Sequence, residues 1–155
     1  MKLIAETAWH HEGDFSFMKN LVSEIVSKTN ADIIKMHITL NFDEYMDPSH
    51  ELYKKLKPMI FNKGQWQELI QIVRDGKKEI MLLLNDRQAI EFGLSFNPEY
   101  VEIHSICLND IFLLEKLKNF GYKVLFFTNK DVEKIEGIEI KKYNITNSFH
   151  RAENI

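Results

Sequence analysis

The chain has 155 residues, of which 45% are hydrophobic and 12% aromatic, and its formal net charge at pH 7 is −3. These values are typical of one globular domain. The 20 basic residues are fewer than the 23 acidic ones and are scattered along the chain, which argues against a nucleic-acid partner. No apolar run approaches the roughly 20 residues that a membrane helix needs. The single cysteine, Cys107, cannot form an internal disulfide and is best interpreted as a small buried hydrophobe, so we expect a cytoplasmic protein.

The chain opens with a predicted strand–helix–strand unit. Lys2 to Ala5 are short and mostly apolar, as in a buried strand, and Asp14 is placed to cap a helix that ends at Thr29. The apolar residues of this helix recur at the spacing of one face: Met18, Leu21, Val22, Ile25 and Val26. Residues 31–38 form the next strand.

Strands and helices then alternate, which predicts a parallel sheet. A long connection contains a short helix from His50 to Lys57 that stops at Pro58. The next helix, Gly64 to Arg74, should bury Trp66, Leu69, Ile70 and Val73. The elements expected after it are a strand in "EIMLLLND", a helix Arg87–Leu94, a strand Tyr100–His104, a helix Asp110–Phe120, a strand Lys123–Thr128 and a possible sixth strand Ile138–Tyr143.

Ionisable residues gather at the carboxyl ends of the predicted strands, where ligands bind in parallel α/β folds. Glu6 closes the first strand, Lys35 and His37 share one face of the second, and Glu102 and His104 share one face of the fourth. An apolar interior tolerates such charges only if they are paired or hold a ligand.

Several segments resemble the sialic acid synthase (N-acetylneuraminate synthase) family. "IAETAWHHEGD", a helix and then "ADIIKMH" are similar to the opening of its barrel. "HELYKKLKPMIFNKGQWQELI" and "YVEIHSICLNDIFLLEKLKNFGYKVLFFTN" resemble later segments, so the likeness extends over roughly residues 2–129. The resemblance implies a (β/α)8 barrel enzyme that condenses phosphoenolpyruvate with an N-acetylhexosamine such as N-acetylmannosamine, helped by manganese or magnesium.

The resemblance also implies roles for individual residues. Glu6 matches the glutamate that holds the hexosamine, Lys35 matches a catalytic-site lysine, and Ser105 matches a serine that contacts the phosphate of phosphoenolpyruvate. His37 stands in the place of a glutamine that contacts the sugar. His11 keeps the family histidine and His10 replaces an asparagine, so both are candidates for substrate binding.

Two departures concern the phosphoenolpyruvate site. Glu102 stands where the family has a lysine that binds this anion, and Leu83 replaces a threonine that helps it. A carboxylate in that place would repel the anion by about 1 kcal/mol or more at short range. The family's two metal-binding histidines belong to the second half of the barrel.

The cluster at the strand ends is open to three interpretations. It is a structural ion-pair network with Lys35 between Glu6 and Glu102, a sugar site centred on Glu6, Lys35 and His37, or a new divalent-metal site that uses His37, His104, Glu102 or Glu6.

The "HHEGD" segment and its neighbour Trp9 also allow alternatives. His10, His11 and Glu12 fit local turn and cap formation better than metal binding, and Asp14 fits a cap better than a catalytic acid. Trp9 could stack on a sugar ring or pack under the long second loop.

The length bears on both fold and activity. A complete (β/α)8 barrel takes about 250 residues, so we expect one domain, a partial TIM-barrel-like half barrel of five to six strands, that is inactive alone. It is either a fragment or a naturally short relative. The alternative to an enzyme is a non-catalytic sugar-binding or assembly module, and the exposed edges of a half barrel favour a homodimer.

Overall fold

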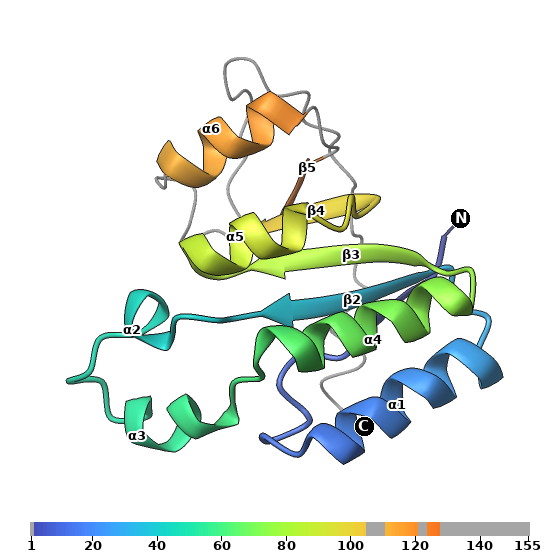
Figure 1. The fold of residues 1–155 in the computed structure, drawn as a ribbon, viewed down its shortest axis with the longest axis horizontal. Helices are drawn as coiled ribbons and strands as arrows, with labels where there is room; N and C mark the ends of the chain where they lie inside the picture. Colours follow the sequence, from blue (N-terminus) through green and yellow to red (C-terminus); the bar gives the residue numbers. More distant parts are fainter. Residues whose placement is uncertain (1, 105–110, 121–123, 128–155) are drawn as a thin grey trace.

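In the part of the chain that the structure describes, five parallel strands form a sheet, with neighbours in chain order from β1 to β5 (Figure 1). The structure is a computed structural model that describes residues 2–104, 111–120 and 124–127. The strands are β1 (Ile4–Glu6), β2 (Ile33–Ile38), β3 (Glu79–Leu84), β4 (Tyr100–His104) and β5 (Val124–Phe127). All four pairings are parallel, as the alternation of predicted elements indicated. Among the described residues β1 and β5 are the sheet edges, which is the arrangement of a partial barrel.

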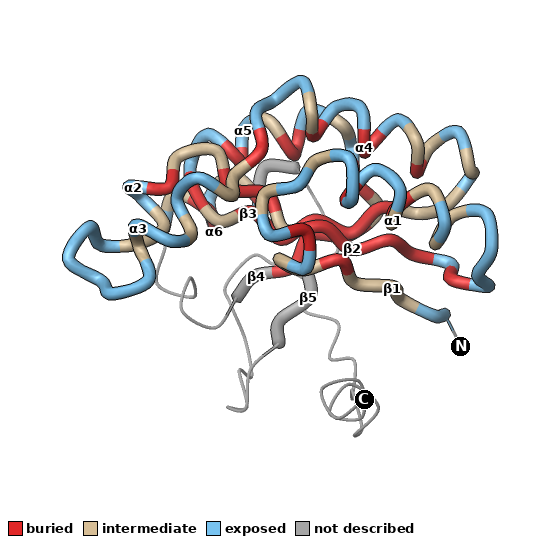
Figure 2. Tube along the Cα trace, turned by 90° about the horizontal axis from the view of Figure 1, so that it is seen from below, coloured by how far each residue is buried: buried red, intermediate tan, exposed pale blue. Residues whose placement is uncertain are grey.

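The helices that connect the strands are α1 (Phe15–Lys28), α2 (Phe42–Tyr45), α3 (Tyr53–Leu56), the 3-10 helix η1 (Lys57–Met59), α4 (Lys63–Asp75), α5 (Arg87–Leu94) and α6 (Ile111–Phe120). Of these, α1, α4 and α5 pack against one face of the sheet (Figure 2), whereas α2 and α3 lie beyond the carboxyl end of β2 (Figure 1). The predicted bounds of α5 and β4 are confirmed, and those of the other strands and long helices are shifted by one or two residues.

The connection between β2 and α4 differs from the prediction. It contains α2, which the sequence analysis did not foresee, and the predicted helix from His50 begins only at Tyr53. Pro58 does not stop the chain's helical path but lies inside η1. Proline is accepted there because the first residues of a helix donate no internal hydrogen bond.

Caps fix the starts of the two longest helices. The Asp14 carboxylate accepts a hydrogen bond from the backbone N–H of Phe17 at 2.9 Å, so its predicted role as the cap of α1 is confirmed. Asn62 and Gln65 form a reciprocal capping box at the start of α4. Such caps contribute about 1 kcal/mol each.

The apolar faces of α1 and α4 pack against each other and against the sheet. Met18 and Val22 of α1 are fully buried, and the predicted face of α4 is buried throughout: Trp66, Leu69, Ile70 and Val73. They meet the side chains of Ile34, Met36 and Ile38, which point to the helix side of β2. Burial of each such side chain contributes about 1.5–3 kcal/mol. The alternate residues of β2, Lys35 and His37, therefore face the other side of the sheet.

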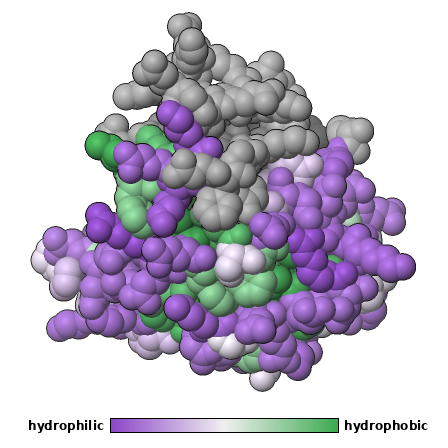
Figure 3. All heavy atoms as spheres, turned by 45° about the horizontal axis from the view of Figure 1, so that its top comes forward, coloured by the Kyte–Doolittle hydropathy of each residue, from purple (hydrophilic) through white to green (hydrophobic). Residues whose placement is uncertain are grey.

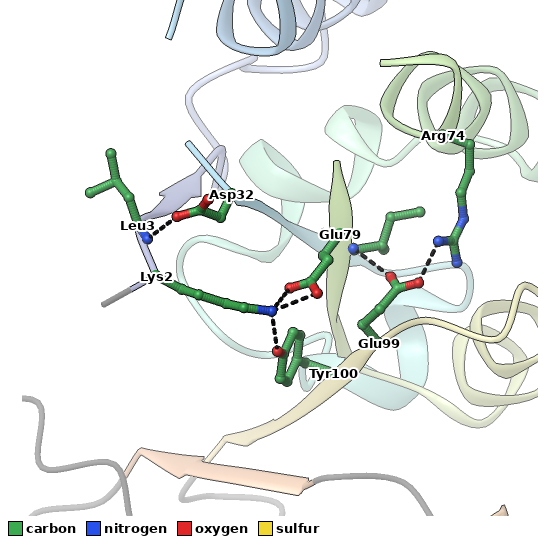
Figure 4. Close-up of polar contacts among 8 residues, drawn as sticks. Lys2, Leu3, Asp32, Arg74, Glu79, Glu99 and Tyr100 are labelled. Carbon is green, nitrogen blue, oxygen red and sulfur yellow. Dashed lines mark hydrogen bonds and ion pairs between the residues drawn. The ribbon is translucent and has the colours of Figure 1, made fainter. Parts of the chain in front are cut away.

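Ion pairs join the elements at the amino ends of the strands (Figure 4). The Lys2 ammonium lies 2.5 Å from the Glu79 carboxylate and 3.1 Å from the Tyr100 hydroxyl, which links residues of β3 and β4 to the start of the chain. On the helix side, Arg74 holds Glu99 and the carbonyls of Phe96 and Asn97.

The surface separates by polarity in the view of Figure 3, where hydrophobic residues gather toward the middle and hydrophilic residues surround them. Within residues 2–104, 111–120 and 124–127, no helix has the length and apolar character needed to cross a bilayer. Cys107 and the possible sixth strand, Ile138–Tyr143, lie outside the described residues.

Candidate functional site

Among the residues that the structure describes, four ionisable side chains from three strands converge on the face of the sheet opposite the helices. The Lys35 ammonium lies 3.0 Å from Oε2 of Glu6 and also contacts Oε2 of Glu102. Nε2 of His37 lies 2.9 Å from Oε1 of Glu6. The contacts run continuously from His37 to Glu102, so these residues form one polar cluster, called here the Lys35 cluster: Glu6, Lys35, His37 and Glu102.

The strand register explains why these residues meet. Glu6 stands directly opposite Lys35 across the β1–β2 pair, and Glu102 stands opposite Leu83, which in turn stands opposite His37. Lys35 comes two residues before His37 and stands opposite Met81. Its long side chain must therefore cross β3 diagonally to reach Glu102. The flexible four-carbon stem of lysine is long enough to make this reach.

Thr7 holds the end of β1 in place beside Lys35. Both its backbone N–H and its hydroxyl donate to the Lys35 carbonyl oxygen, each at 3.1 Å, and its side chain is buried. This double contact fixes the residue next to Glu6. It therefore sets how the Glu6 carboxylate meets Lys35.

Burial separates the two carboxylates. The side chain of Glu102 is 4% exposed and that of Glu6 is 27% exposed, while the Lys35 side chain between them is 8% exposed. Glu6 is thus the carboxylate that solvent or a ligand can reach.

The two carboxyl groups also differ in their pKa values. The hydrogen bond from His37, together with the charge of Lys35, lowers the pKa of Glu6 to about 2 although burial opposes the shift. Burial raises the pKa of Glu102 above its usual value, and the nearby Lys35 only partly offsets this. Opposite shifts in neighbouring carboxyls are a feature of functional sites and also of structural ion-pair networks.

Solved structures of known proteins share this arrangement of strands and helices. An N-acetylneuraminic acid (sialic acid) synthetase from Leptospira borgpetersenii, solved with citrate, superposes with a TM-score of 0.70 over 80% of this chain, at 22% identity. The chain has a sialic acid synthase-like fold. Two spore coat polysaccharide biosynthesis proteins match it as well, SpsE from Bacillus subtilis (TM-score 0.62, 19% identity, 81% of this chain) and protein E from Chromobacterium violaceum (0.66, 18%, 80%).

The likeness to sialic acid synthase-like structures covers only part of those proteins. This chain spans 43% of the Leptospira protein, 35% of the Bacillus protein and 40% of the Chromobacterium protein. No protein-family description matches the sequence, and no curated protein does. At 18–22% identity the comparison establishes the fold, and the substrates of this chain have to be argued from its own residues.

The loop after β1 contains the "HHEGD" segment, residues 10–14, and forms a turn. Asp14 N–H donates to the His11 carbonyl at 2.7 Å, and Gly13 N–H donates to Nδ1 of His11 at 3.0 Å. Gly13 has a φ of +87°, and a Cβ there would lie 3.1 Å from the Cα of Met59. Glycine is therefore needed both for the turn and for the close approach of η1.

The two histidines of this loop have different surroundings. His11 is buried with its ring 4.3 Å from that of Phe61, and burial lowers its pKa. His10 is exposed, and its Nδ1 lies 3.2 Å from the Thr7 carbonyl oxygen. His11 therefore packs inside the loop and its role in substrate binding stays a prediction, whereas His10 is accessible near the end of β1.

Trp9 packs among other rings. Its ring stacks at 5.8 Å on His11 and at 6.3 Å on Tyr45 of α2, and it meets the ring of Phe42 edge to face. Of the two roles considered from the sequence, these contacts fit packing under the long second loop.

The described residues do not fit a divalent metal. No group of three or more His, Cys, Asp or Glu side chains in this part of the chain could hold one. Lys35 contacts Oε2 of Glu6 and Oε2 of Glu102, and Nε2 of His37 faces Oε1 of Glu6. Of the other candidates, Ser105 and the side chain of His104 lie outside what the structure describes, so a metal site involving His104 stays a prediction.

Asp86 is a buried polar residue that follows the carboxyl end of β3 and was not among the residues predicted from the sequence. Its carboxylate accepts from the backbone N–H of Ala89, as the cap of α5, and from that of Leu40 after β2. Beside it, Asn85 donates to the Thr39 hydroxyl at 2.9 Å. An aspartate directly before a predicted helix was the available signal, since aspartate is a favoured capping residue.

Proposed function

We propose that the Lys35 cluster is the sugar-binding part of a sialic acid synthase-like site and that its ligand is an N-acetylhexosamine such as N-acetylmannosamine. Glu6 carries this proposal because its carboxylate is charged, held in place and accessible. His37 and Lys35 each engage one of its oxygens, and 27% of the side chain remains exposed. Ionised oxygens can accept about four hydrogen bonds, so capacity remains for sugar hydroxyls.

The roles of the neighbouring residues follow from their contacts with Glu6. Lys35 and His37 orient the carboxylate, and the 14% exposed His37 ring is placed to touch the ligand as well. His10 lies exposed on the adjoining loop and is a further candidate contact. The fold supports the proposal, because the solved proteins that share it include a sialic acid synthetase and a spore coat polysaccharide biosynthesis protein.

We propose that condensation of the sugar with phosphoenolpyruvate needs a complete sialic acid synthase-like site that also holds a divalent metal. The reaction would take place in the cytoplasm. We expect this chain alone to bind sugar without turnover. The reason is charge, since the resemblance places Glu102 where the family has a lysine for its anionic substrate, and this carboxylate is buried against Lys35. Leu83 beside it offers no hydrogen-bond donor.

Sugar binding is tested by titrating N-acetylmannosamine into the labelled protein and following backbone amide shifts by NMR. We expect saturable shifts at Thr7 and at residues 35–37. Glu6→Gln should weaken binding at least tenfold, because the amide keeps the shape but loses the charge and one acceptor. Glu24→Gln is the matched control, since Glu24 pairs with Lys28 on the exposed side of α1. Equal affinity of the two variants would contradict the role of Glu6.

Turnover is tested separately by phosphate release from phosphoenolpyruvate with N-acetylmannosamine and manganese. No release above the Glu6→Ala background is expected from the 155-residue chain. Release that depends on Glu6 would show that a complete site assembles from this chain.

A homodimer is part of the proposal. The described sheet has two edges, at β1 and β5, and hydrophobic residues gather on the face seen in Figure 3. Unpaired edges and apolar patches both favour association. Light scattering coupled to gel filtration should give twice the chain mass of 18.4 kDa, and a mass of 18.4 kDa at all concentrations would contradict it.

A further inference from the structure

We propose that Glu102 determines the charge class of the ligand: by occupying the Lys35 ammonium from inside the protein, it turns anionic ligands away from the site. The proposal rests on the Lys35 cluster being a ligand site, and it adds which ligands the site refuses.

The first support is the geometry at Lys35. Its ammonium contacts a carboxylate oxygen from each side, Oε2 of Glu6 and Oε2 of Glu102, and its side chain is 8% exposed. Because so little of the Lys35 side chain is exposed and a carboxylate lies on each side of its ammonium, a phosphate or carboxylate ligand would have to come between the ammonium and one of these internal partners to reach it.

The second support is the balance of charge. Two carboxylates, those of Glu6 and Glu102, surround one ammonium, so the three charged groups together are negative. Nε2 of His37 pairs with Glu6, so among the described residues Lys35 is the cation in direct contact with Glu102. Screening by water is weak at Glu102, which is 4% exposed, and repulsion of an approaching anion is correspondingly strong there.

The third support is that Glu102 depends on Lys35. Burial raises the pKa of this carboxyl, and Lys35 is the first group that opposes the shift. Displacing Lys35 toward an external anion would leave a buried carboxylate unpaired, which is strongly unfavourable. A neutral ligand with hydroxyl or amide donors avoids this conflict, because it can bind the accessible Glu6 without disturbing the Lys35–Glu102 pair.

The test reverses the charge and uses inorganic phosphate as the probe, titrated at constant ionic strength and followed by calorimetry. Glu102→Lys should bind phosphate at least tenfold more tightly than the unaltered chain, because two ammonium groups then face one carboxylate. Glu102→Gln should give a smaller gain, about threefold. Glu115→Lys, at an exposed position of α6, is the control for the same change of net charge.

Phosphate affinity of Glu102→Lys no higher than that of Glu115→Lys would overturn the proposal, as would tight phosphate binding by the unaltered chain. If Glu102→Lys does not fold, the phosphate affinity of Glu102→Gln is the test. An affinity no higher than that of the unaltered chain would overturn the proposal. A purely structural ion pair would change stability in these variants but not phosphate affinity. Failure of N-acetylmannosamine to bind the unaltered chain would refute the proposed sugar ligand and leave the phosphate comparison intact.

Discussion

Glu6 and Glu102 contact the same ammonium, that of Lys35, although they belong to strands separated by two others in the sheet. The two carboxylates differ in exposure, 27% against 4%, and their pKa values move in opposite directions. One lysine thus links an accessible carboxylate on the edge strand β1 with a buried carboxylate on the interior strand β4.

Replacing Lys35, the cation that both carboxylates share, should strongly destabilise the fold. Lys35→Met keeps the length and packing of the side chain but leaves Glu102 buried without its partner, so we expect a loss of about 3–5 kcal/mol in the free energy of unfolding. The triple variant Glu6→Gln/Lys35→Met/Glu102→Gln should recover most of this loss, because no buried charge remains. Urea denaturation followed by circular dichroism measures both. Equal stability of the single and triple variants would show that the charges do not matter.

Stability should fall on acidification, and Glu6 should account for a defined part of the loss. Its pKa is lowered in the fold from 4.5 to about 2, so its contribution is complete above pH 4.5 and disappears as the pH falls through 2. The shift corresponds to at most about 3 kcal/mol. Urea midpoints between pH 7 and pH 2 should therefore fall less steeply for Glu6→Gln than for the unaltered chain.

Glu102 should behave in the opposite sense. Its pKa is raised in the fold, so the folded state holds this proton more tightly than the unfolded state does. Acidification through its folded pKa then favours folding. Glu102→Gln removes this stabilisation by proton uptake, so the unfolding free energy of the variant should fall more steeply on acidification than that of the unaltered chain. A shallower fall would contradict a raised pKa of Glu102.

The sequence predicted those parts of the fold that follow from local periodicity. The alternation along "IIKMHI" was enough to place Lys35 and His37 on one face, and the spacing from Trp66 to Val73 was enough to find the buried face of α4. Local periodicity does not predict contacts between segments that are distant in the sequence. The four-residue α2 is held by tertiary contacts such as the Glu44 carboxylate on the backbone N–H of Arg87, and no local pattern encodes them.

The candidate site was predicted in part for the same reason. Strand ends and alternation brought Glu6, Lys35, His37 and Glu102 to one region. Which of them pair depends on the register between strands, and that Lys35 reaches diagonally past Leu83 to Glu102 could not be read from a single strand. The exposure of Glu6 relative to Glu102 likewise depends on their positions in the assembled sheet.

The contacts of Arg74 with Glu99 and Asn97 allow a test of stability away from the Lys35 cluster (Figure 4). Its guanidinium lies 2.5 Å from Glu99, whose other oxygen accepts from Ile80 N–H, and it donates to the Asn97 carbonyl at 2.9 Å. Arg74→Lys should lose about 1–2 kcal/mol of unfolding free energy, because a lysine cannot reach several acceptors as a planar fork does. Lys19→Met, which removes an exposed pair with Glu68, should change it by under about 0.5 kcal/mol. Equal losses in thermal or urea unfolding would show that Arg74 acts only as a surface charge.

Gly93 tests how closely α5 lies on the sheet. A Cβ at this position would lie 2.5 Å from one methyl of Leu84 and 3.2 Å from one of Leu82, both in the buried core. Gly93→Ala gains about 1 kcal/mol in helix propensity, but overpacking a core costs about 1–3 kcal/mol, so we expect net destabilisation. In combination with Leu84→Ala, which opens space for the new methyl, the same substitution should instead stabilise the protein. A double-mutant cycle in urea measures this coupling. Additive effects of the two changes would mean that α5 shifts freely on β3, because a mobile helix would relieve the contact without help from Leu84.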